Sequence, residues 1–568
     1  MRRGGWFGEM PVGVPFIVSM EAMERFSYYG FRAILTLYLR DELGLSASAA
    51  VATFEFTSSL AYASPLVGGW LADAVIGKYR TILWLGLVYC CGLWLLVLAA
   101  ARESFLLSLV ALFLAGFGTG GIKPCVSSFG ADQYAAESSM ERDDDPAVRR
   151  YFAVFYAAIN VGSVLSFLTV PLVRAQRGYA AAFALPAVLL TVALASFYAA
   201  TDLYVEPRVI KTQQNHFYTT LGKALKGTFF SFFATASNCD DDNDDVKKKQ
   251  TPQAAIDFFE KGPANQYHGG DIFEDVVFLQ DEDRVPEEDD DDDVSRLIGV
   301  FRVLSSLPVF WLLYDQQGSV WVVQANDMQR GWLQPEQLGV ANPIFILCLL
   351  PFFEKVVYPF LEDRLGKRAT QPTARVKVGM ACAALAFLVA AVVDHNLPLH
   401  ILYQLPQIFL ISVAEILVSV TCLEYSYAMA PPAYRALVTS AYLLTTAIGD
   451  AAAGSLYAGL GPFVSRTSLL VACALLMVAT IALFARVSTA PPPLGQHRRR
   501  RDEIMKQATT TTGHFVFENN KGDNKKDQQQ QPSSSSSSEE SSPRRGLQLQ
   551  HLSRPAAGRR GATGASLI

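Results

Sequence analysis

The chain has 568 residues, of which 51% are hydrophobic and only 18% are charged. Soluble domains contain about a quarter charged residues, so this composition excludes an ordinary soluble protein. The formal net charge of −5 carries little information, because the charges lie in loops and tails, and we expect no nucleic-acid partner. The eight cysteines fall mostly in apolar stretches and indicate no disulfide framework.

The apolar residues fall in runs of about 20, the length that an α-helix needs to cross a bilayer. These runs are apolar all round, unlike the single apolar stripe of a soluble helix. The runs lie at 11–40, 48–76, 81–101, 105–129, 148–174, 179–203, 295–324, 338–361, 374–394, 399–430, 433–461 and 467–487. They predict an all-α membrane protein of the major facilitator fold, with 12 transmembrane helices in two six-helix bundles and a site between the bundles.

The spans divide the chain into four predicted parts. Residues 1–203 form an N-terminal six-helix bundle, 204–294 a linker loop, 295–488 a C-terminal six-helix bundle, and 489–568 a tail. The linker carries acidic runs, which are typical of a solvated segment rather than of a metal site. The tail is rich in Gln and Ser, and we expect it to be disordered.

Lys and Arg in the short connections predict the orientation in the membrane. They follow the second span, the eighth span and the last span: Lys78, Arg80, Arg364, Lys367, Arg368, Arg375, Lys377 and Arg498–Arg501. All of them fall on the side of Arg2 and Arg3. We therefore expect both termini and the linker to be cytosolic. The first apolar stretch is too long and too charged for a cleavable signal peptide.

The first span carries ionisable residues inside an apolar helix. Glu21, Glu24, Arg25, Tyr28 and Arg32 share one face at 100° per residue, with Tyr29 at its edge. Each charge would cost roughly 2.5–3.5 kcal/mol at the bilayer centre, so this face must line a polar cavity. A purely structural network of ion pairs is the alternative.

Other spans add isolated polar groups that suit a zwitterionic ligand. The first half contributes the cations Arg25, Arg32 and Lys123, and the second half contributes the carboxylates Asp315 and Glu415. Lone charges inside a span need a ligand or a partner. Aromatic and amide side chains supply further expected contacts: Tyr28, Tyr29, Tyr62, Tyr156, Asn160, Phe310, Trp311 and Asn342.

Several motifs resemble those of the proton-coupled oligopeptide transporter (POT) family. The segments that carry the likeness are Glu21-x-x-Glu24-Arg25-Phe26, Gly118-Thr-Gly-Gly-Ile-Lys123-Pro124 and Phe155-Tyr156-x-x-Ile159-Asn160. A further segment, Gly69-x-x-x-Asp73-x-x-x-Gly77-Lys78-Tyr79-Arg80, looks like the cytosolic gating motif of the wider superfamily. The likeness covers the membrane core of both halves and omits the linker and the tail.

The resemblance implies alternating-access import of di- and tripeptides driven by protons, with no other cofactor, by a chain that works as a monomer in the lipid bilayer. It implies a coupling set of Glu21, Glu24, Arg25, Lys123 and Glu55. It matches Tyr29, Arg32, Asn160, Asn342 and Glu415 to peptide-contacting positions. Together with Tyr442 and the polar and aromatic groups named above, the predicted substrate contacts are Tyr29, Arg32, Tyr62, Lys123, Tyr156, Asn160, Trp311, Asp315, Asn342, Glu415 and Tyr442. The gating residues would be Gly69, Asp73, Gly77, Lys78 and Arg80.

This chain also departs from the animal members of that family. Glu55 stands where they carry a histidine, Tyr442 replaces a tryptophan, and Gly299 replaces an arginine. The first change leaves two readings open: a titrating carboxylate takes over the role of the histidine, or the proton route differs.

Other functions also have to be considered for this chain. Nitrate transport in the family relies on a histidine of the seventh span, and 295–324 contains none. Amino-acid or histidine export and a non-transporting peptide receptor are further readings. No catalytic set, metal-ligand cluster or phosphate loop falls in the spans, so we expect no enzyme. We expect the plasma membrane, with an endolysosomal or vacuolar membrane as the alternative.

Overall fold

The computed structural model describes residues 10–135, 146–205, 290–430 and 435–489. The regular elements in these ranges are helices. Nearly all of the predicted linker and all but the first residue of the predicted tail lie outside the described residues, and so do Cys239 and the arginines 498–501. Their predicted properties stay predictions.

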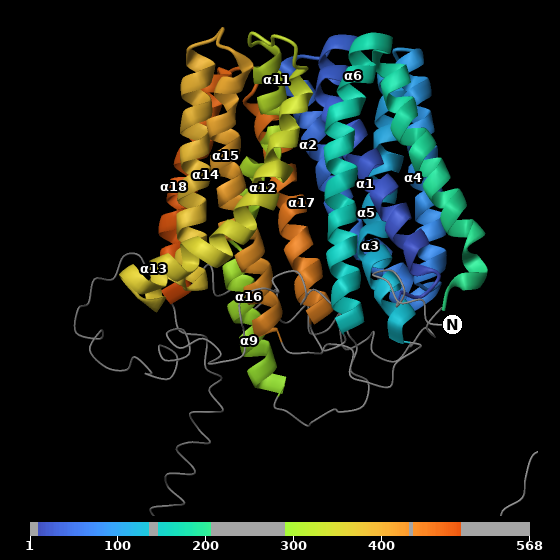
Figure 1. Ribbon diagram of the computed structural model, residues 1–568. Helices are drawn as coiled ribbons and strands as arrows, with labels where there is room; N and C mark the ends of the chain where they lie inside the picture. The colour runs from blue at the N-terminus through green and yellow to red at the C-terminus, as the bar shows by residue number, and fades with distance from the viewer. Residues whose placement is uncertain (1–9, 136–145, 206–289, 431–434, 490–568) are drawn as a thin grey trace, which may run out of the picture. The chain divides into compact units, whose positions relative to one another are not determined.

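The described residues of the first half contain six α-helices (Figure 1). They are α1 (Val14–Leu37), α2 (Ala47–Ala63), α3 (Pro65–Trp70), α4 (Lys78–Ala101), α5 (Phe105–Ala135) and α6 (Pro146–Ala199). Single π-helical segments follow α1 and α3, at Tyr38–Glu42 and Leu71–Val75. The long α6 breaks at Gly178, whose φ of 81° is the left-handed backbone that glycine favours, and the break separates the predicted spans 148–174 and 179–203.

The second half is more interrupted than the sequence predicts. Its helices are α9 (Asp290–Leu304), α10 (Leu307–Tyr314), α11 (Val320–Asn326), α12 (Ala341–Phe352), α13 (Tyr358–Leu365), α14 (Pro372–His395), α15 (Leu405–Glu415), α16 (Thr421–Met429), α17 (Arg435–Gly459) and α18 (Arg466–Thr489). A 3-10 turn, Asp315–Gly318, separates α10 from α11. A second one, Pro335–Val340, precedes α12. π segments lie at Phe353–Val357 and Ile416–Val420.

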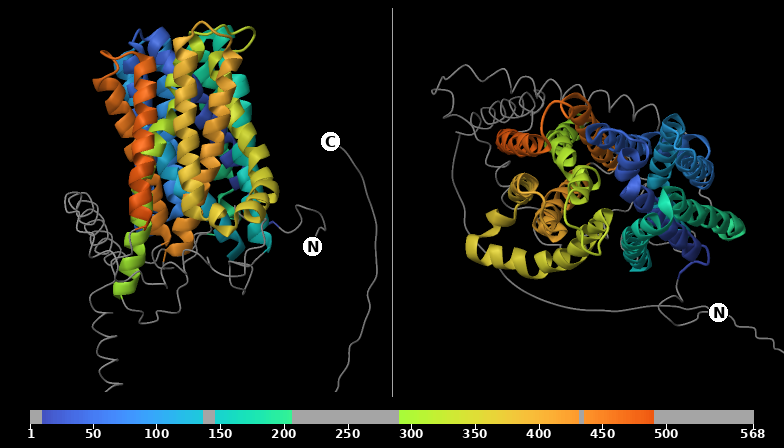
Figure 2. Two further views of the ribbon diagram at one scale, coloured as in Figure 1. Left: turned by 90° about the vertical axis from the view of Figure 1, so that its left-hand side faces the viewer. Right: turned by 90° about the horizontal axis from the view of Figure 1, so that it is seen from above.

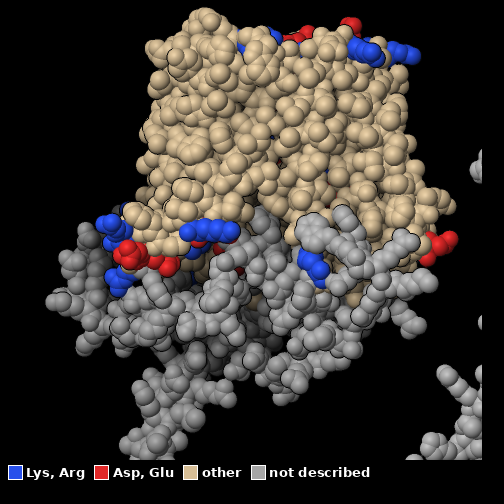
Figure 3. All heavy atoms as spheres, in the orientation of Figure 1, with Lys and Arg blue, Asp and Glu red and all other residues tan. Residues whose placement is uncertain are grey.

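Eight helical stretches of the described residues are long and apolar enough to cross a membrane. The predicted number of spans is larger for physical reasons. The stretch 150–199 contains two predicted spans, α1 carries four charges, and Ser64 interrupts the second span between α2 and α3. The predicted span 433–461, which contains α17, is also not among the eight. The visible face has charged residues at its two ends and an uncharged belt between them (Figure 3). The chain is therefore an all-helical, multi-pass membrane protein.

The buried apolar side chains form two separate cores, one in each half. One core contains residues from Val14 to Phe197, and the other contains residues from Leu297 to Phe484. Val51 and Ala52 of α2 join the core of the second half, and Val322 of α11 joins that of the first. Helix α2 packs along α17, so this pair forms the largest contact between the halves (Figure 2).

Glycines let α3 and α5 pack with their backbones almost touching. A Cβ atom on Gly68 would lie 1.9 Å from the carbonyl oxygen of Gly121. One on Gly120 would lie 2.0 Å from the hydroxyl oxygen of Ser64 and 2.2 Å from the carbonyl oxygen of Ala61. The glycines of the fourth-span motif thus set the packing beside the gating segment.

We expect Gly68→Ala to lower the apparent melting temperature of the purified protein, because the new methyl group meets backbone that cannot move aside. Overpacking of this kind costs about 1–3 kcal/mol. Gly69→Ala is the matched control, since a Cβ there meets nothing within 4 Å. Equal melting temperatures for the two variants in a detergent scan would contradict this account of the packing.

Candidate functional site

The polar face of α1 forms a compact ion cluster. The Arg25 guanidinium contacts the carboxylates of Glu21, at 3.0 Å, and Glu24. The Thr119 hydroxyl of α5 donates a hydrogen bond of 2.8 Å to Glu24. Both carboxylates are buried, with 5% and 0% of Glu21 and Glu24 exposed. The predicted cluster is therefore present, and one guanidinium serves two carboxylates.

Lys123 forms no ion pair with this cluster, although we expected it to be the cluster's cationic partner. Its ammonium group lies 3.9 Å from the centre of the Tyr62 ring and 4.5 Å from that of Tyr28. Such cation–π contacts are strongest where water is excluded. No described carboxylate lies within ion-pair distance of Lys123. Its charge is held by two aromatic faces and is open to an anionic ligand.

An ion pair between Arg32 and Asp315 joins the two halves. The Arg32 guanidinium also lies 4.8 Å from the centre of the Phe54 ring. Asp315 begins the 3-10 turn after α10, and the Thr36 hydroxyl donates to the carbonyl of Gly318 in the same turn, at 3.0 Å. We expected Arg32 to face a substrate carboxylate, but here a substrate would compete with Asp315 for it.

Glu55, which the family resemblance assigns to the coupling set, lies on α2 and is fully buried. Its Oε1 atom accepts a hydrogen bond of 2.5 Å from the hydroxyl of Ser319, which belongs to the other half. Its Oε2 atom has no partner among the described residues. The carboxyl of Glu55 therefore also lies at the contact between the halves.

Glu415 lies at the end of α15 and has two neutral donors. The Tyr314 hydroxyl donates to it at 2.6 Å and the Asn342 amide at 3.2 Å. Tyr29 and Tyr156 of the first half lie close enough to interact with it electrostatically. No described Lys or Arg pairs with Glu415, so its carboxylate is open to a cationic ligand group.

The other expected substrate contacts already have partners within the protein. The Tyr29 ring packs on Phe167, with centroids 5.9 Å apart, and the Trp311 ring packs on Tyr442 at 6.0 Å. Tyr442 exchanges a hydrogen bond of 2.6 Å with the Ser419 hydroxyl. The Asn160 amide donates to the Tyr156 carbonyl one turn earlier, at 2.9 Å, so one of its two donors is already used.

The gating motif lies where α3 turns into α4. Gly77 has a φ of 84° that allows the turn, and the ammonium of Lys78 pairs with Asp132 of α5 at 2.7 Å. Asp73 lies in the π segment before the turn and interacts electrostatically with Lys78. Arg80 is exposed, and open space surrounds Gly69.

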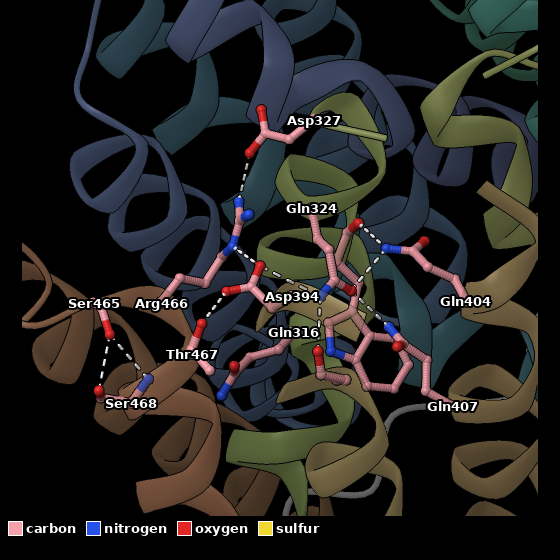
Figure 4. Close-up of polar contacts among 12 residues, drawn as sticks. Gln316, Gln324, Asp327, Asp394, Gln404, Gln407, Ser465, Arg466, Thr467 and Ser468 are labelled. Carbon is pink, nitrogen blue, oxygen red and sulfur yellow. Dashed lines mark hydrogen bonds and ion pairs between the residues drawn. The ribbon is translucent and has the colours of Figure 1, made fainter. Parts of the chain in front are cut away.

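Ion pairs also join the halves at the end of the bundle opposite the gating motif. Arg174 of α6 pairs with Glu336 at 2.7 Å, and Arg40 lies 3.4 Å from Asp327 after α11. Asp327 also pairs with Arg466 of α18, at 2.8 Å, and Arg466 continues to Asp394 of α14 (Figure 4). These contacts hold this end of the two halves together.

We expect Glu336→Gln to lower the apparent melting temperature by several degrees. Arg174 would keep a charge that is only 14% exposed and lose its partner, and removal of one member of a buried pair costs about 3–5 kcal/mol. The double variant Arg174→Gln/Glu336→Gln should recover most of the loss, and Arg177→Gln, an exposed arginine on the same helix, should change nothing. A double variant less stable than Glu336→Gln would contradict the pairing.

Sequence reasoning missed four side chains that the structure brings to these sites. Thr119, Asp132 and Tyr314 act as partners from other helices, and a single sequence does not reveal such pairings. Asp450 is different, because it is the only acidic residue in the predicted span 433–461. A lone buried charge of that kind was the signal that singled out Lys123 and Glu415, and it could have found Asp450.

Comparison with known proteins agrees with these motifs. The family model described as POT family matches residues 79–460. Solute carrier family 15 member 2 of Rattus norvegicus is 34% identical over 403 residues, which cover 68% of this chain and 49% of the relative. Peptide transporter family 2 of Caenorhabditis elegans is 32% identical over 409 residues, covering 69% and 48%. The chain spans about half the length of the curated relatives that it matches.

Solved structures of transporters share the fold. The crystal structure of the POT family transporter PepTSo is 28% identical, with a TM-score of 0.68 and coverage of 84% of this chain and 98% of that one. An auto-inhibited POT family peptide transporter is 26% identical, with a TM-score of 0.67 and coverage of 86% and 98%. The matching model, the relatives and the signature residues agree, and the chain belongs to the POT family.

Proposed function

We propose that this chain is a proton-coupled symporter that carries di- and tripeptides across a membrane by alternating access. Its relatives are named as peptide transporters, and membership of the POT family supports the same activity here. We assign it no enzymatic activity and no cofactor other than the coupling protons.

The proposed substrate class rests on two ionisable groups, one in each half, that lack an ion-pair partner among the described residues. The Lys123 ammonium in the first half and the Glu415 carboxylate in the second half have no ion-pair partner among the described residues. A zwitterionic peptide would bring its carboxylate to Lys123 and its ammonium to Glu415, so that each of these half-buried charges gains a partner only when substrate is bound. Trp311, Tyr62 and Tyr442 would contact the side chains of the peptide.

The cluster around Arg25 supplies the coupling. Protonation of Glu24 releases part of the attraction that holds Arg25 to it, so that Arg25 and nearby Lys123 present more positive charge to the substrate carboxylate. Loss of that proton restores the pair and weakens peptide binding. Arg32 takes part as well, because it can exchange Asp315 for substrate as the contact between the halves opens.

The architecture we propose has twelve membrane-spanning helices in two six-helix bundles, acting as a monomer. The basic residues near the gating motif favour a cytosolic position for that end and for both termini. The ion pairs of Arg174 and Arg40 then close the extracellular end. The plasma membrane is the proposed location.

Uptake of a labelled dipeptide into proteoliposomes tests this substrate class. Under an inward proton gradient we expect peptide to accumulate, and unlabelled di- and tripeptides to compete. Free amino acids, histidine and nitrate should compete weakly. Strong competition by nitrate or by a single amino acid would overturn the peptide assignment, and binding without uptake would point to a receptor.

A further inference from the structure

Asp450 is a buried acid that the proposed mechanism does not yet use. It lies on α17, which packs against α2 of the first half and α10 of its own half. The residue is 0% exposed, and neither carboxyl oxygen has a hydrogen-bond partner among the described residues. An ionised carboxylate in such a place would be strongly destabilising.

The groups that act most strongly on Asp450 come from three other segments. They are Asp315 in the turn after α10, Glu55 on α2 and Arg32 on α1. The neighbouring Gly449 packs against Pro308 and Trp311 of α10. The Ser59 hydroxyl of α2 donates to the carbonyl of Ala447 at 2.8 Å, so Asp450 lies where α17, α10 and α2 meet. The other described titratable groups on α17 and on the helices packed against it are Tyr62, Arg302, Tyr314, Cys422, Glu424, Tyr425, Tyr442 and Tyr457, and none of them is among these strongest neighbours.

These four groups have an excess of acid over base. Arg32 binds the Oδ1 atom of Asp315, whereas its Oδ2 atom has no partner. Glu55 receives only the Ser319 hydroxyl and keeps one oxygen unpaired. Three carboxyls thus share a single guanidinium, and two of them have no cation. The described carboxyls are also not arranged as a set of three or more ligands for a metal ion.

One proton removes the problem at Asp450. A protonated Asp450 carboxyl would have an O–H to donate to Asp315, whose Oδ2 atom has no partner among the described residues. One negative charge would then remain for Arg32. Two carboxylates that share a site ordinarily hold one proton between them, because both cannot ionise at close range. The geometry therefore matches a proton position rather than a permanent ion pair.

We propose that Asp450 and Asp315 share a proton in a second proton site, completed by Glu55, at the contact between α2 and α17. Loss of this proton adds a negative charge to the second half beside the Glu55 carboxyl of the first half, and the repulsion between the halves weakens that contact. The consequence for transport rests on the proposed symport, whereas protonation of Asp450 does not depend on it.

The ratio of protons to peptide tests the transport consequence. In proteoliposomes held at zero voltage with a pH difference of one unit, each coupled proton multiplies the attainable peptide ratio by about ten. With protons at both Glu24 and Asp450, the wild-type chain should exceed a tenfold ratio and approach about a hundredfold for a neutral dipeptide. Asp450→Asn should lower the ratio about tenfold. Asp363→Asn, an exposed carboxylate on α13, is the matched control.

Infrared difference spectra of the full chain provide a readout without transport. Between acid and alkaline buffer, the wild type should show the carbonyl band of a protonated buried carboxyl. Asp450→Asn should remove one component of that band and leave the components of Glu24 and the other buried carboxyls. Asp450→Glu should shift the Asp450 component, and Asp363→Asn should preserve it. The Glu variant keeps the experiment decisive where the Asn variant does not fold.

The outcomes separate this proposal from the proposed function. A wild-type chain that accumulates no peptide contradicts symport, and the infrared band still decides on Asp450. A wild-type ratio limited to about tenfold, or an unchanged ratio in Asp450→Asn, overturns the second proton site. So does a carboxyl band whose components are all unchanged in Asp450→Asn.

Discussion

Glu24→Gln is expected to lower the peptide accumulation that a proton gradient drives by about 500-fold. One proton entering down 100 mV and one pH unit contributes about 2.3 and 1.4 kcal/mol, and each 1.4 kcal/mol is a factor of about ten. Glutamine keeps the size of Glu24 and its contact with Thr119, but it cannot bind and release a proton. Arg25 keeps its ion pair with Glu21 in this variant, so the loss should appear in accumulation far more than in stability.

The measurement is the steady ratio of labelled dipeptide inside and outside proteoliposomes at several external pH values. Glu42→Gln replaces an exposed glutamate just after α1 and should match the wild type. A Glu24→Gln protein that still concentrates peptide, with an unchanged pH dependence, would remove Glu24 from the coupling role.

Glu415→Gln is expected to weaken binding of unblocked dipeptides by about 30-fold or more. Loss of one partner from a buried, hydrogen-bonded charge pair costs at least about 2 kcal/mol, and this converts to that ratio. Tyr314 and Asn342 can still donate to the glutamine oxygen. The change therefore isolates the negative charge that we assign to the substrate ammonium.

A peptide with a blocked N-terminus distinguishes loss of this charge from a general defect. An N-acetylated dipeptide has no ammonium, so it should bind wild type and Glu415→Gln about equally weakly. Glu103→Gln, an exposed glutamate between α4 and α5, should behave like the wild type. A variant that loses affinity for both peptides to the same degree would mean that Glu415 supports the site without meeting the ammonium.

The polar face of α1 could be predicted from the sequence because it follows from helical periodicity alone. Residues three and four apart lie on one face, and the structure indeed brings Glu21, Glu24 and Arg25 into contact. The sequence could not predict that Arg32 pairs with Asp315 or that Lys123 lies over two tyrosine rings. These contacts join segments that are distant in the sequence. The roles of these residues in transport remain predictions.

The helices could be located from apolar runs, but their interruptions could not. The 3-10 turn after Tyr314 and the π segment after Glu415 occur inside stretches that read as continuous spans. Both breaks lie beside residues of the candidate site, and π segments are often found at functional sites. Contacts with other helices, such as the hydrogen bond from Thr36 to Gly318, stabilise these breaks. A hydropathy pattern contains no information about such contacts.

Peptide-driven proton movement tests the central claim most directly. Proteoliposomes containing the chain are prepared with equal pH on both sides, zero voltage and a pH-sensitive dye inside, and dipeptide is then added outside. Symport predicts that the lumen acidifies as peptide enters, that acidification scales with the peptide gradient, and that it disappears with protein-free vesicles. Peptide entry without any change in lumenal pH would contradict proton-coupled transport.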